Sequence, residues 1–272
     1  SCSRNLDERE EDMRRYVFVF LVLVLWTGKA LAFHPLVTDD TGTQGKGRFQ
    51  FELNGQISLD KQKSDDGGSV STVKTRESEL KAALTYGVSD RHDVTVGLPY
   101  QWKKTDIDDA ESARFDGFSD ICMEWKWRFY ESGGLSFAVK PGLTLPTGDK
   151  DKDLGAGRVT GSLFLIATKE ADPVIFHVNA GYKRNENKLS QREDILHASV
   201  AGEYRIAKPL RLVADVGAET NSDPGSRTWP AYILGGFIYG VSENFDLDAG
   251  VKAGLNDAEK DVSFLAGITI RF

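Results

Sequence analysis

The chain ends in Val262-Ser-Phe-Leu-Ala-Gly-Ile-Thr-Ile-Arg-Phe272, a stretch in which apolar and polar side chains alternate. This period of two is typical of a β-strand with one apolar and one polar face, and Leu265 is the only exception. The final strand of a bacterial outer-membrane barrel typically ends on Phe in this way. It pairs with the first strand, because an open sheet edge would leave backbone groups unpaired in lipid. The stretch therefore predicts that the upstream chain consists of similar strands.

Eleven further stretches alternate in the same way. They cover residues 48–60, 74–86, 92–103, 118–130, 135–147, 158–168, 174–184, 194–206, 210–220, 229–239 and 245–255. The connections after the odd-numbered strands are long and charged, and those after the even-numbered strands are short. This asymmetry and an even strand count are typical of outer-membrane barrels. The sequence predicts an all-β fold, a transmembrane antiparallel up-and-down β-barrel of about 12 strands with both termini in the periplasm.

A soluble β-sandwich also alternates, and it is the alternative fold. Three features favour the barrel. The centre of the apolar face lacks charged residues in all twelve stretches, whose length also suits a tilted membrane strand. Aromatic residues border the short turns, as an interfacial girdle would, namely Tyr86, Phe129, Tyr204, Tyr239 and Phe245.

The N-terminal part of the chain is typical of an exported protein. Residues 13–32 have the form of a signal peptide, with basic residues, an apolar run too short to span a bilayer, and the cleavage box Ala30-Leu-Ala32. Residues 1–12 are charged and lack a period. We expect them to be a mistranslated leader before a true start at Met13, with a short disordered tail as the alternative. Residues 33–46 should form an irregular periplasmic or lumenal segment, and residues 47–272 the barrel.

The composition and charge of the chain exclude several classes of protein. The net charge is −7, and it is unchanged when residues 1–32 are removed. The sequence contains no basic patch of the kind that would predict nucleic-acid binding. Cys122 is the only cysteine after the signal peptide, which excludes an intramolecular disulfide or a cysteine zinc site. The absence of a second long apolar run excludes a helical membrane protein.

Three motifs carry a family resemblance. The segment His34-Pro-Leu-Val-Thr-Asp-Asp-Thr-Gly-Thr-Gln-Gly-Lys-Gly47 leads directly into Phe49-Gln-Phe-Glu52. Together with Leu145-Pro-Thr-Gly-Asp149 and the turn Tyr86-Gly-Val-Ser-Asp90, it resembles the outer-membrane transporters named for the meta-pathway of phenol degradation. The resemblance covers essentially the whole mature chain. The residues that carry its N-terminal motif are His34, Pro35, Thr38, Asp39, Asp40, Gly45 and Gly47.

The resemblance implies a twelve-stranded barrel in the outer membrane of a Gram-negative cell, with a transport role. We expect a porin-like channel or transporter for small solutes, including hydrophobic or aromatic ones, and no enzyme. The family is also similar to the barrel that exports functional amyloid subunits, so a secretion or structural barrel for a partner polypeptide is the alternative. The exporter has a long periplasmic extension, whereas only roughly fourteen residues of the mature chain precede the first predicted strand at residues 48–60. The implied partners are the lipid bilayer, lipopolysaccharide, the barrel-assembly machinery, a small-molecule solute and a further copy of the chain.

The polar faces of the strands carry charges of both signs, which inside a barrel must be paired or hydrated. Twelve strands lie between side-chain-filled barrels and open porins, so a narrow, partly wet pore crossed by ion pairs is expected. The lumen-lining candidates are Glu79, Lys81, Glu124, Lys126, Arg128, Lys140, His177, Lys183, His197, Glu203, Arg205, Arg211, Asp215, Asp248 and Lys252.

Five apolar residues occupy positions that alternation assigns to the lumen, namely Phe164, Ile166, Leu234, Ile238 and Leu265. They predict either an apolar patch for a hydrophobic solute or a packing surface for the N-terminal segment. Both alternatives remain open at this point.

Two patterns suggest other chemistry. His177, His197 and Ser199 share the polar face, as a hydrolase site would require, but same-face residues on one strand are about 6–7 Å apart. That spacing predicts no direct His197–Ser199 bond, and hydrogen-bonded lumen histidines are favoured. The loop Asp149-x-Asp151-x-Asp153 resembles a calcium loop but lacks its required Gly and Glu, and Asp39-Asp40 is more typical of a turn. We therefore predict neither a metal site nor a cofactor.

Overall fold

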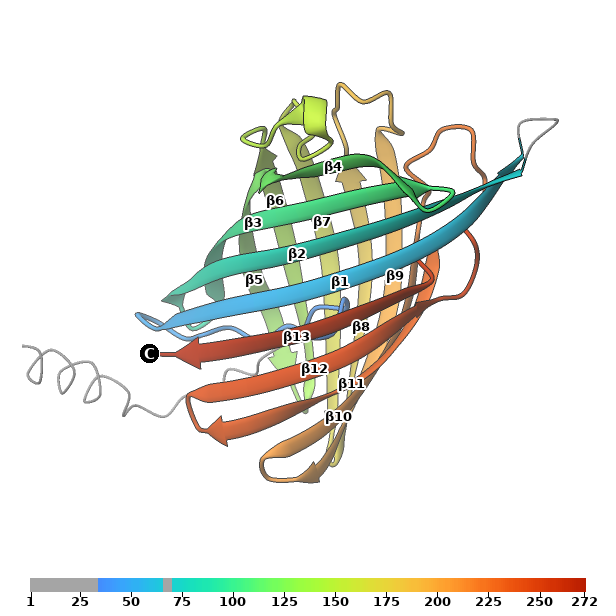
Figure 1. Cartoon of the computed structure of the whole chain (residues 1–272). Helices are drawn as coiled ribbons and strands as arrows, with labels where there is room; N and C mark the ends of the chain where they lie inside the picture. Colours follow the sequence, from blue (N-terminus) through green and yellow to red (C-terminus); the bar gives the residue numbers. More distant parts are fainter. Residues whose placement is uncertain (1–33, 66–69) are drawn as a thin grey trace, which may run out of the picture.

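The barrel is closed by its first and last strands. The computed structural model describes residues 34–65 and 70–272; the predicted leader and signal peptide lie outside the described residues. The described chain forms one antiparallel sheet, in which β1 pairs with both β2 and β13 (Figure 1). The register runs from Gln50 opposite Arg271 to Leu59 opposite Val262. Closure overturns the sandwich alternative and confirms the predicted barrel.

Thirteen strands occupy twelve positions around the barrel. Their bounds are β1 Phe49–Asp65, β2 Val70–Ser89, β3 His92–Ile107, β4 Ala110–Phe118, β5 Ile121–Ser132, β6 Leu135–Leu145, β7 Thr160–Ala171, β8 Val174–Arg184, β9 Asp194–Ala207, β10 Leu210–Glu219, β11 Ala231–Ser242, β12 Phe245–Gly254 and β13 Val262–Arg271. β4 and β5 pair with successive parts of β3 and together make one barrel strand. Asp120 lies in the break between β4 and β5. Its carboxylate accepts hydrogen bonds from the backbone N–H groups of Gly148 and Ala156, each at 2.8 Å. This contact folds the connection between β6 and β7 against the break.

Two of the predicted long loops are hairpins instead. β1 and β2 remain paired as far as Asp65 opposite Val70, and β3 turns directly into β4 at Asp108-Asp109, both with positive φ. These parts of the strands lack an apolar face, which made them resemble loops in the sequence. Outside the membrane a sheet needs no apolar face, because strand pairing satisfies the backbone whatever the side chains.

The outer wall exposes a broad apolar band. Leu165, Phe176 and Ile233 are each at least half exposed, at 57, 50 and 51%. Water-soluble proteins rarely expose a continuous apolar band, whereas lipid favours one, and a closed barrel satisfies every backbone group in lipid. The protein is therefore a β-barrel of the outer membrane. Tyr86, Phe129, Tyr204 and Tyr239 are exposed beside the short turns, which confirms four members of the predicted girdle, and Phe245 is half-buried.

The described residues contain no helix that is long and apolar enough to cross a membrane. The only helical element among them is the short 3-10 turn η1 Lys150–Lys152 in the connection between β6 and β7. β1 begins and β13 ends at the short-turn end of the barrel (Figure 1). That this end faces the periplasm remains a prediction.

Candidate functional site

The N-terminal segment, residues 34–46, lies inside the barrel and is bound to its inner wall (Figure 1). His34 Nδ1 and Asp248 Oδ1 of β12 are 2.5 Å apart. The backbone N–H of Thr38 donates to Asp215 Oδ2 of β10 at 2.8 Å, and the Thr38 hydroxyl donates to Oδ1 at 2.7 Å. Asp215 is only 2% exposed, so these donors stabilise a buried carboxylate. The predicted lumen residues Asp215 and Asp248 thus hold the segment.

The other side of the segment is bound by polar side chains of β7 and β8. Asp39 and Asn179 bond reciprocally, since the Asp39 N–H donates to Asn179 Oδ1 at 2.9 Å and Asn179 Nδ2 donates to the Asp39 carbonyl at 2.7 Å. The Thr41 N–H donates to Thr168 Oγ1 at 3.2 Å. An irregular backbone inside a barrel needs such partners for its polar groups. The wall therefore fixes the path of the segment in detail.

Apolar packing holds the segment as well. Leu36 belongs to a buried cluster whose other members are Ala201, Val213, Tyr232, Leu234, Ile238 and Leu265. Three of the five apolar lumen residues thus pack the segment, which was one of the two alternatives. Ile166 is buried at 1% exposure, whereas Phe164 lines a cavity. Only Phe164 remains available to contact a solute.

The motif residues Pro35, Gly45 and Gly47 contribute through close packing and backbone conformation. Pro35 lies so close to the backbone of Gly236 and Gly250 that a Cβ on either would meet it at 3.0 Å. Gly45 and Gly47 have φ of +84 and +79°, a conformation that favours glycine. The N–H of Gly47 donates to the Gly87 carbonyl at 2.8 Å, where the segment leaves the lumen and becomes β1.

Charged side chains meet at the centre of the lumen. Asp39 lies 2.8 Å from the ammonium groups of both Lys126 and Lys140. Lys140 also contacts Glu124 at 3.0 Å, and Lys126 contacts Asp40 at 3.3 Å. The cluster therefore carries fixed charges of both signs across the passage.

Two cavities meet at this cluster. The larger has a volume of about 620 Å³, and the smaller, between the segment and the wall formed by β1–β3, about 140 Å³. Asp39, Glu124 and Lys140 line both. A third cavity of about 280 Å³ lies at the short-turn rim and shares Gln44 with the second. The three cavities share lining residues in turn and lie one after another along the N-terminal segment.

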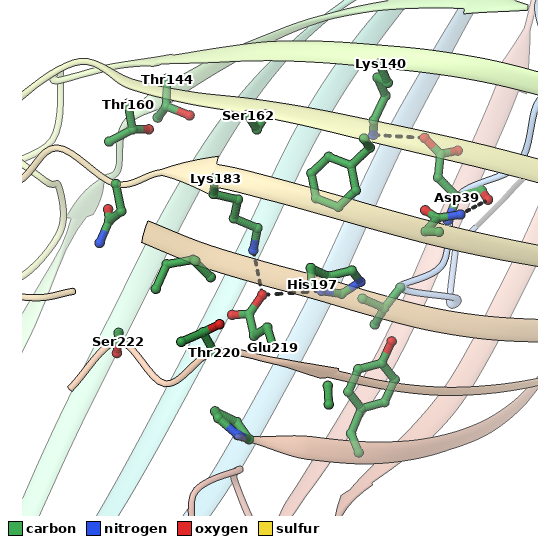
Figure 2. Close-up of a pocket in the computed structure, with 18 of the residues that line it drawn as sticks. Asp39, Lys140, Thr144, Thr160, Ser162, Lys183, His197, Glu219, Thr220 and Ser222 are labelled. Atoms are coloured by element: carbon green, nitrogen blue, oxygen red, sulfur yellow. Dashed lines mark hydrogen bonds and ion pairs between the residues drawn. The ribbon is translucent and has the colours of Figure 1, made fainter. Parts of the chain in front are cut away.

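The larger cavity is polar with an aromatic inner part (Figure 2). Thr144, Thr160 and Ser162 line it near the long loops. The ring of Phe164 lies below Lys140 Nζ, 5.8 Å from the ring centroid, and meets the His197 ring edge-on. Such a wall offers both hydrogen bonds and an aromatic surface to a bound molecule.

His197 and Ser199 are in direct contact, so the prediction of no direct bond was wrong. His197 Nε2 is 3.1 Å from Ser199 Oγ, and its Nδ1 is 3.4 Å from Glu219 Oε2. The histidine side chain leans along the strand and bridges the interval between the two residues. Glu219 is bonded in turn by Lys183 Nζ at 2.7 Å (Figure 2). Ser199 is 4% exposed and does not line the cavity, whereas His197, Glu219 and Lys183 do, so the serine hydroxyl lies buried behind this part of the cavity wall.

A second buried network runs around the lumen wall. His177 lies 3.0 Å from Thr168 Oγ1 and 3.1 Å from Glu203 Oε1. Arg211 donates to Glu203 at 2.5 Å and lies 3.8 Å from Asp246. Arg271 then links Asp246 to Gln50, at 2.7 and 3.2 Å. These pairs leave little room for solvent on this side of the lumen.

The remaining predicted lumen residues lie at different heights in the barrel. Glu79 accepts from Gln101 at 2.7 Å beside a cavity of about 270 Å³, and Lys81 lines the 140 Å³ cavity. Lys252 pairs with Glu259 at 3.1 Å. Arg128 donates to the Asp90 carbonyl at the short-turn rim. Arg205 is exposed and pairs with Asp172 in a turn, outside the lumen, because its strand has passed beyond the wall there.

The candidate set omitted several charged lumen residues, namely Asp93, Glu219, Asp246 and Arg271. All four occupy the polar face of their strands, so alternation was the signal that could have found them. Asp93 accepts the backbone N–H of Gln44 at 2.9 Å and thereby holds the end of the N-terminal segment.

The aspartates of the calcium-like loop do not converge. Asp149 caps η1, Asp151 pairs with Lys150, and Asp153 pairs with Lys103 at 2.5 Å. Among the residues that the structure describes, no group of three or more His, Cys, Asp or Glu side chains is placed to hold a metal ion. The loop is thus an ion-paired surface turn.

Replacement of Asp39 should change the ion preference of the lumen. In Asp39→Asn, Lys126 and Lys140 lose their shared carboxylate, so anions should be favoured by at least about threefold over the wild type. The reversal potential in a potassium chloride gradient across a planar bilayer measures this ratio. The exposed loop variant Asp223→Asn is the control, and equal shifts in the two variants would show that the effect is only of net charge.

Comparison with known proteins identifies a family. The sequence profile of the family described as "Putative MetA-pathway of phenol degradation" matches residues 38–272. No curated protein sequence matches significantly.

Solved structures share the fold. The COG4313 outer membrane channel from Pseudomonas putida F1 has a TM-score of 0.66 at 14% identity, covering 89% of this chain and all of that one. The NanC porin has a TM-score of 0.52 at 8% identity, covering 81 and 98%. The toluene transporter TbuX of Ralstonia pickettii has a TM-score of 0.51 at 9% identity, covering 86 and 92%. At these identities the likeness concerns the barrel fold alone.

Proposed function

The chain belongs to the family described for a MetA-pathway of phenol degradation, and we propose that it is an outer-membrane channel for small solutes. Aromatic and otherwise hydrophobic solutes are the class that its lumen favours. The observation that carries the proposal is the series of cavities that passes beside the N-terminal segment. The cavities meet at the cluster of Asp39, Glu124 and Lys140.

The larger cavity has the size and the lining of a small-molecule site. Its volume of about 620 Å³ lies within the usual range for such sites, ~300–1,000 Å³. Phe164 offers the face of an aromatic ring, and Lys140 and His197 lie against it. A solute with an aromatic ring and one polar group would match this arrangement. That one of the structural neighbours is described as a toluene transporter supports the same class.

The alternative of a secretion barrel is less favoured. An exported polypeptide would have to displace the N-terminal segment, which is held by the buried residues Asp215 and Leu36. The cavity that remains between the segment and the wall formed by β1–β3 has a volume of about 140 Å³, much smaller than the 620 Å³ of the larger cavity.

The structural neighbours are transport proteins, and we propose that this barrel is likewise not an enzyme. Ser199, whose hydroxyl would have to be the nucleophile of a hydrolase here, is buried and does not line the larger cavity. The barrel-assembly machinery as the insertion partner and a homo-oligomer as the assembled state remain predictions.

Solute binding in the larger cavity should be visible as current interruptions. Phenol added to a planar bilayer that holds the purified protein should interrupt the current more than equal concentrations of cyclohexanol. The reason is that an aromatic pair with Phe164 adds a contact worth about 0.5–1.5 kcal/mol, roughly two- to tenfold in residence time. Phe164→Ala should remove the difference between the two solutes.

The control for this experiment is Phe115→Ala, since Phe115 is an exposed aromatic residue on β4 and does not line the larger cavity. It should retain the preference for phenol. Equal interruption by phenol and cyclohexanol in the wild type would contradict the proposed solute class, and a barrel that conducts no ions would contradict a channel.

A further inference from the structure

Four strands extend beyond the membrane as a small sheet. β1, β2, β3 and β4 continue past the apolar band of the barrel and form two hairpins beside each other (Figure 1). The side of this sheet that continues the lipid-facing wall starts above Leu59, which is 39% exposed. Outward side chains on this sheet therefore lie where the bilayer meets water.

The register places three cations in one row on that side. Arg76 of β2 lies opposite Lys104 of β3, and Lys104 lies opposite Arg114 of β4. In the next row Lys61 lies opposite Lys74. Like charges directly opposite each other destabilise a sheet, so this arrangement is costly unless an anion neutralises it. We call Arg76, Lys104 and Arg114 the basic row.

Acidic residues compensate only part of this charge. Lys104 pairs with Asp106 at 3.0 Å and with Glu111 at 3.6 Å, and Lys74 pairs with Asp109. Arg76 and Arg114 are exposed, and neither forms an ion pair with an acidic side chain of residues 34–63 or 70–272, the side chains that the structure describes. The two guanidinium groups at the ends of the basic row are therefore available to an external anion.

An aromatic layer below the basic row indicates the depth of the membrane. Tyr100, Trp102 and Phe118 form a cluster with ring centroids 4.6 and 5.0 Å apart, and the Tyr100 hydroxyl donates to Asp116 at 2.6 Å. Trp and Tyr prefer the interface between the hydrocarbon and the headgroups. The basic row lies two residues beyond Trp102 along β3, or about 7 Å, which is the level of headgroup phosphates.

We propose that the basic row binds the phosphate groups of a lipid A molecule in the leaflet that faces the long connections. Long connections mark the outer side of outer-membrane barrels, and that leaflet is built from phosphorylated lipid A. Guanidinium groups bind phosphate through paired, charge-assisted hydrogen bonds, and Trp102 and Phe118 would lie against the acyl chains. Bound phosphate also removes the repulsion within the row. This site is independent of the solute that the lumen carries.

The test measures lipid binding to the purified, delipidated, full-length barrel in detergent by native mass spectrometry. Bisphosphorylated lipid A should bind at least about tenfold more tightly than dephosphorylated lipid A, because each cation near a headgroup contributes roughly fivefold. The variant that combines Arg76→Gln, Lys104→Gln and Arg114→Gln should lose this preference. Its unheated gel mobility reports that the barrel is folded.

The matched control combines Arg91→Gln, Lys169→Gln and Lys208→Gln, which removes three cations near the short turns. It should bind both lipids as the wild type does. Inorganic phosphate, added at the concentration of lipid A, should not displace the lipid. The proposal is overturned if the basic-row variant keeps the tenfold preference, if the control loses it equally, or if inorganic phosphate alone displaces the lipid.

Discussion

Replacement of Leu165 by arginine is expected to prevent most of the protein from folding into a bilayer, whereas arginine at Ser162 should be tolerated. Leu165 lies at the centre of β7 and is 57% exposed on the apolar outer wall. An arginine at the lipid midplane of a barrel costs about 2–4 kcal/mol. Ser162, three residues away on the same strand, lines the larger cavity, where a guanidinium group remains hydrated.

The measurement is the difference in gel mobility between unheated and boiled samples after refolding into liposomes, since only closed barrels show it. Equal loss of the folded band in both variants would contradict the assignment of the two faces. The last strand offers no matched pair for this experiment. Thr269 faces inward as alternation predicts, but it is fully buried at 0% exposure, so arginine could not fit there.

Removal of residues 34–44 is expected to raise the single-channel conductance severalfold. The segment occupies the lumen and leaves a passage of about 140 Å³ beside it. Without it, the larger cavity should open directly towards the short-turn rim. The barrel wall is closed by strand pairing alone, so it should still form, although Asp215 and Asp248 lose their partners.

Two variants distinguish the effect of the segment's volume on the conductance from the effect of its bonds to the wall. Replacement of residues 34–44 by Gly and Ser at the same length keeps the chain but removes its contacts, and should give intermittent openings. Asp215→Asn weakens the bonds to Thr38 and should increase the frequency of openings to a smaller extent. Unchanged conductance after the deletion would show that the segment does not restrict the current.

The positions of most strands could be predicted from alternation. β8 has the predicted bounds, 174–184, and the predicted strand at 245–255 differs from β12 by one residue. The reason is that lipid outside and water inside impose opposite preferences on successive side chains. Where this constraint ends, prediction failed: the hairpin ends of β1–β4 lie outside the membrane and have no apolar face to recognise.

The contacts of the candidate site required the structure. The motif from His34 to Gly47 was visible in the sequence, but nothing local indicates that Asp39 meets Lys126 and Lys140, which are about a hundred residues away. The bond between His197 and Ser199 was not predicted, because the spacing of residues along a strand does not include the length of the histidine side chain. Distances between side-chain atoms depend on rotamers that the neighbouring strands select.

Alternation along the chain was sufficient to predict the closed all-β barrel and the side chains that face lipid, because both follow from a period of two and from the cost of unpaired backbone in a membrane. The position of Leu36, Thr38 and Asp39 in the lumen, and the volume of the cavity beside them, could be known only from the folded barrel. It alone placed Arg76 beside Lys104 as well. Contacts of this kind join residues far apart in the chain, and their energy depends on register, side-chain direction and burial, which appear only once the barrel has closed.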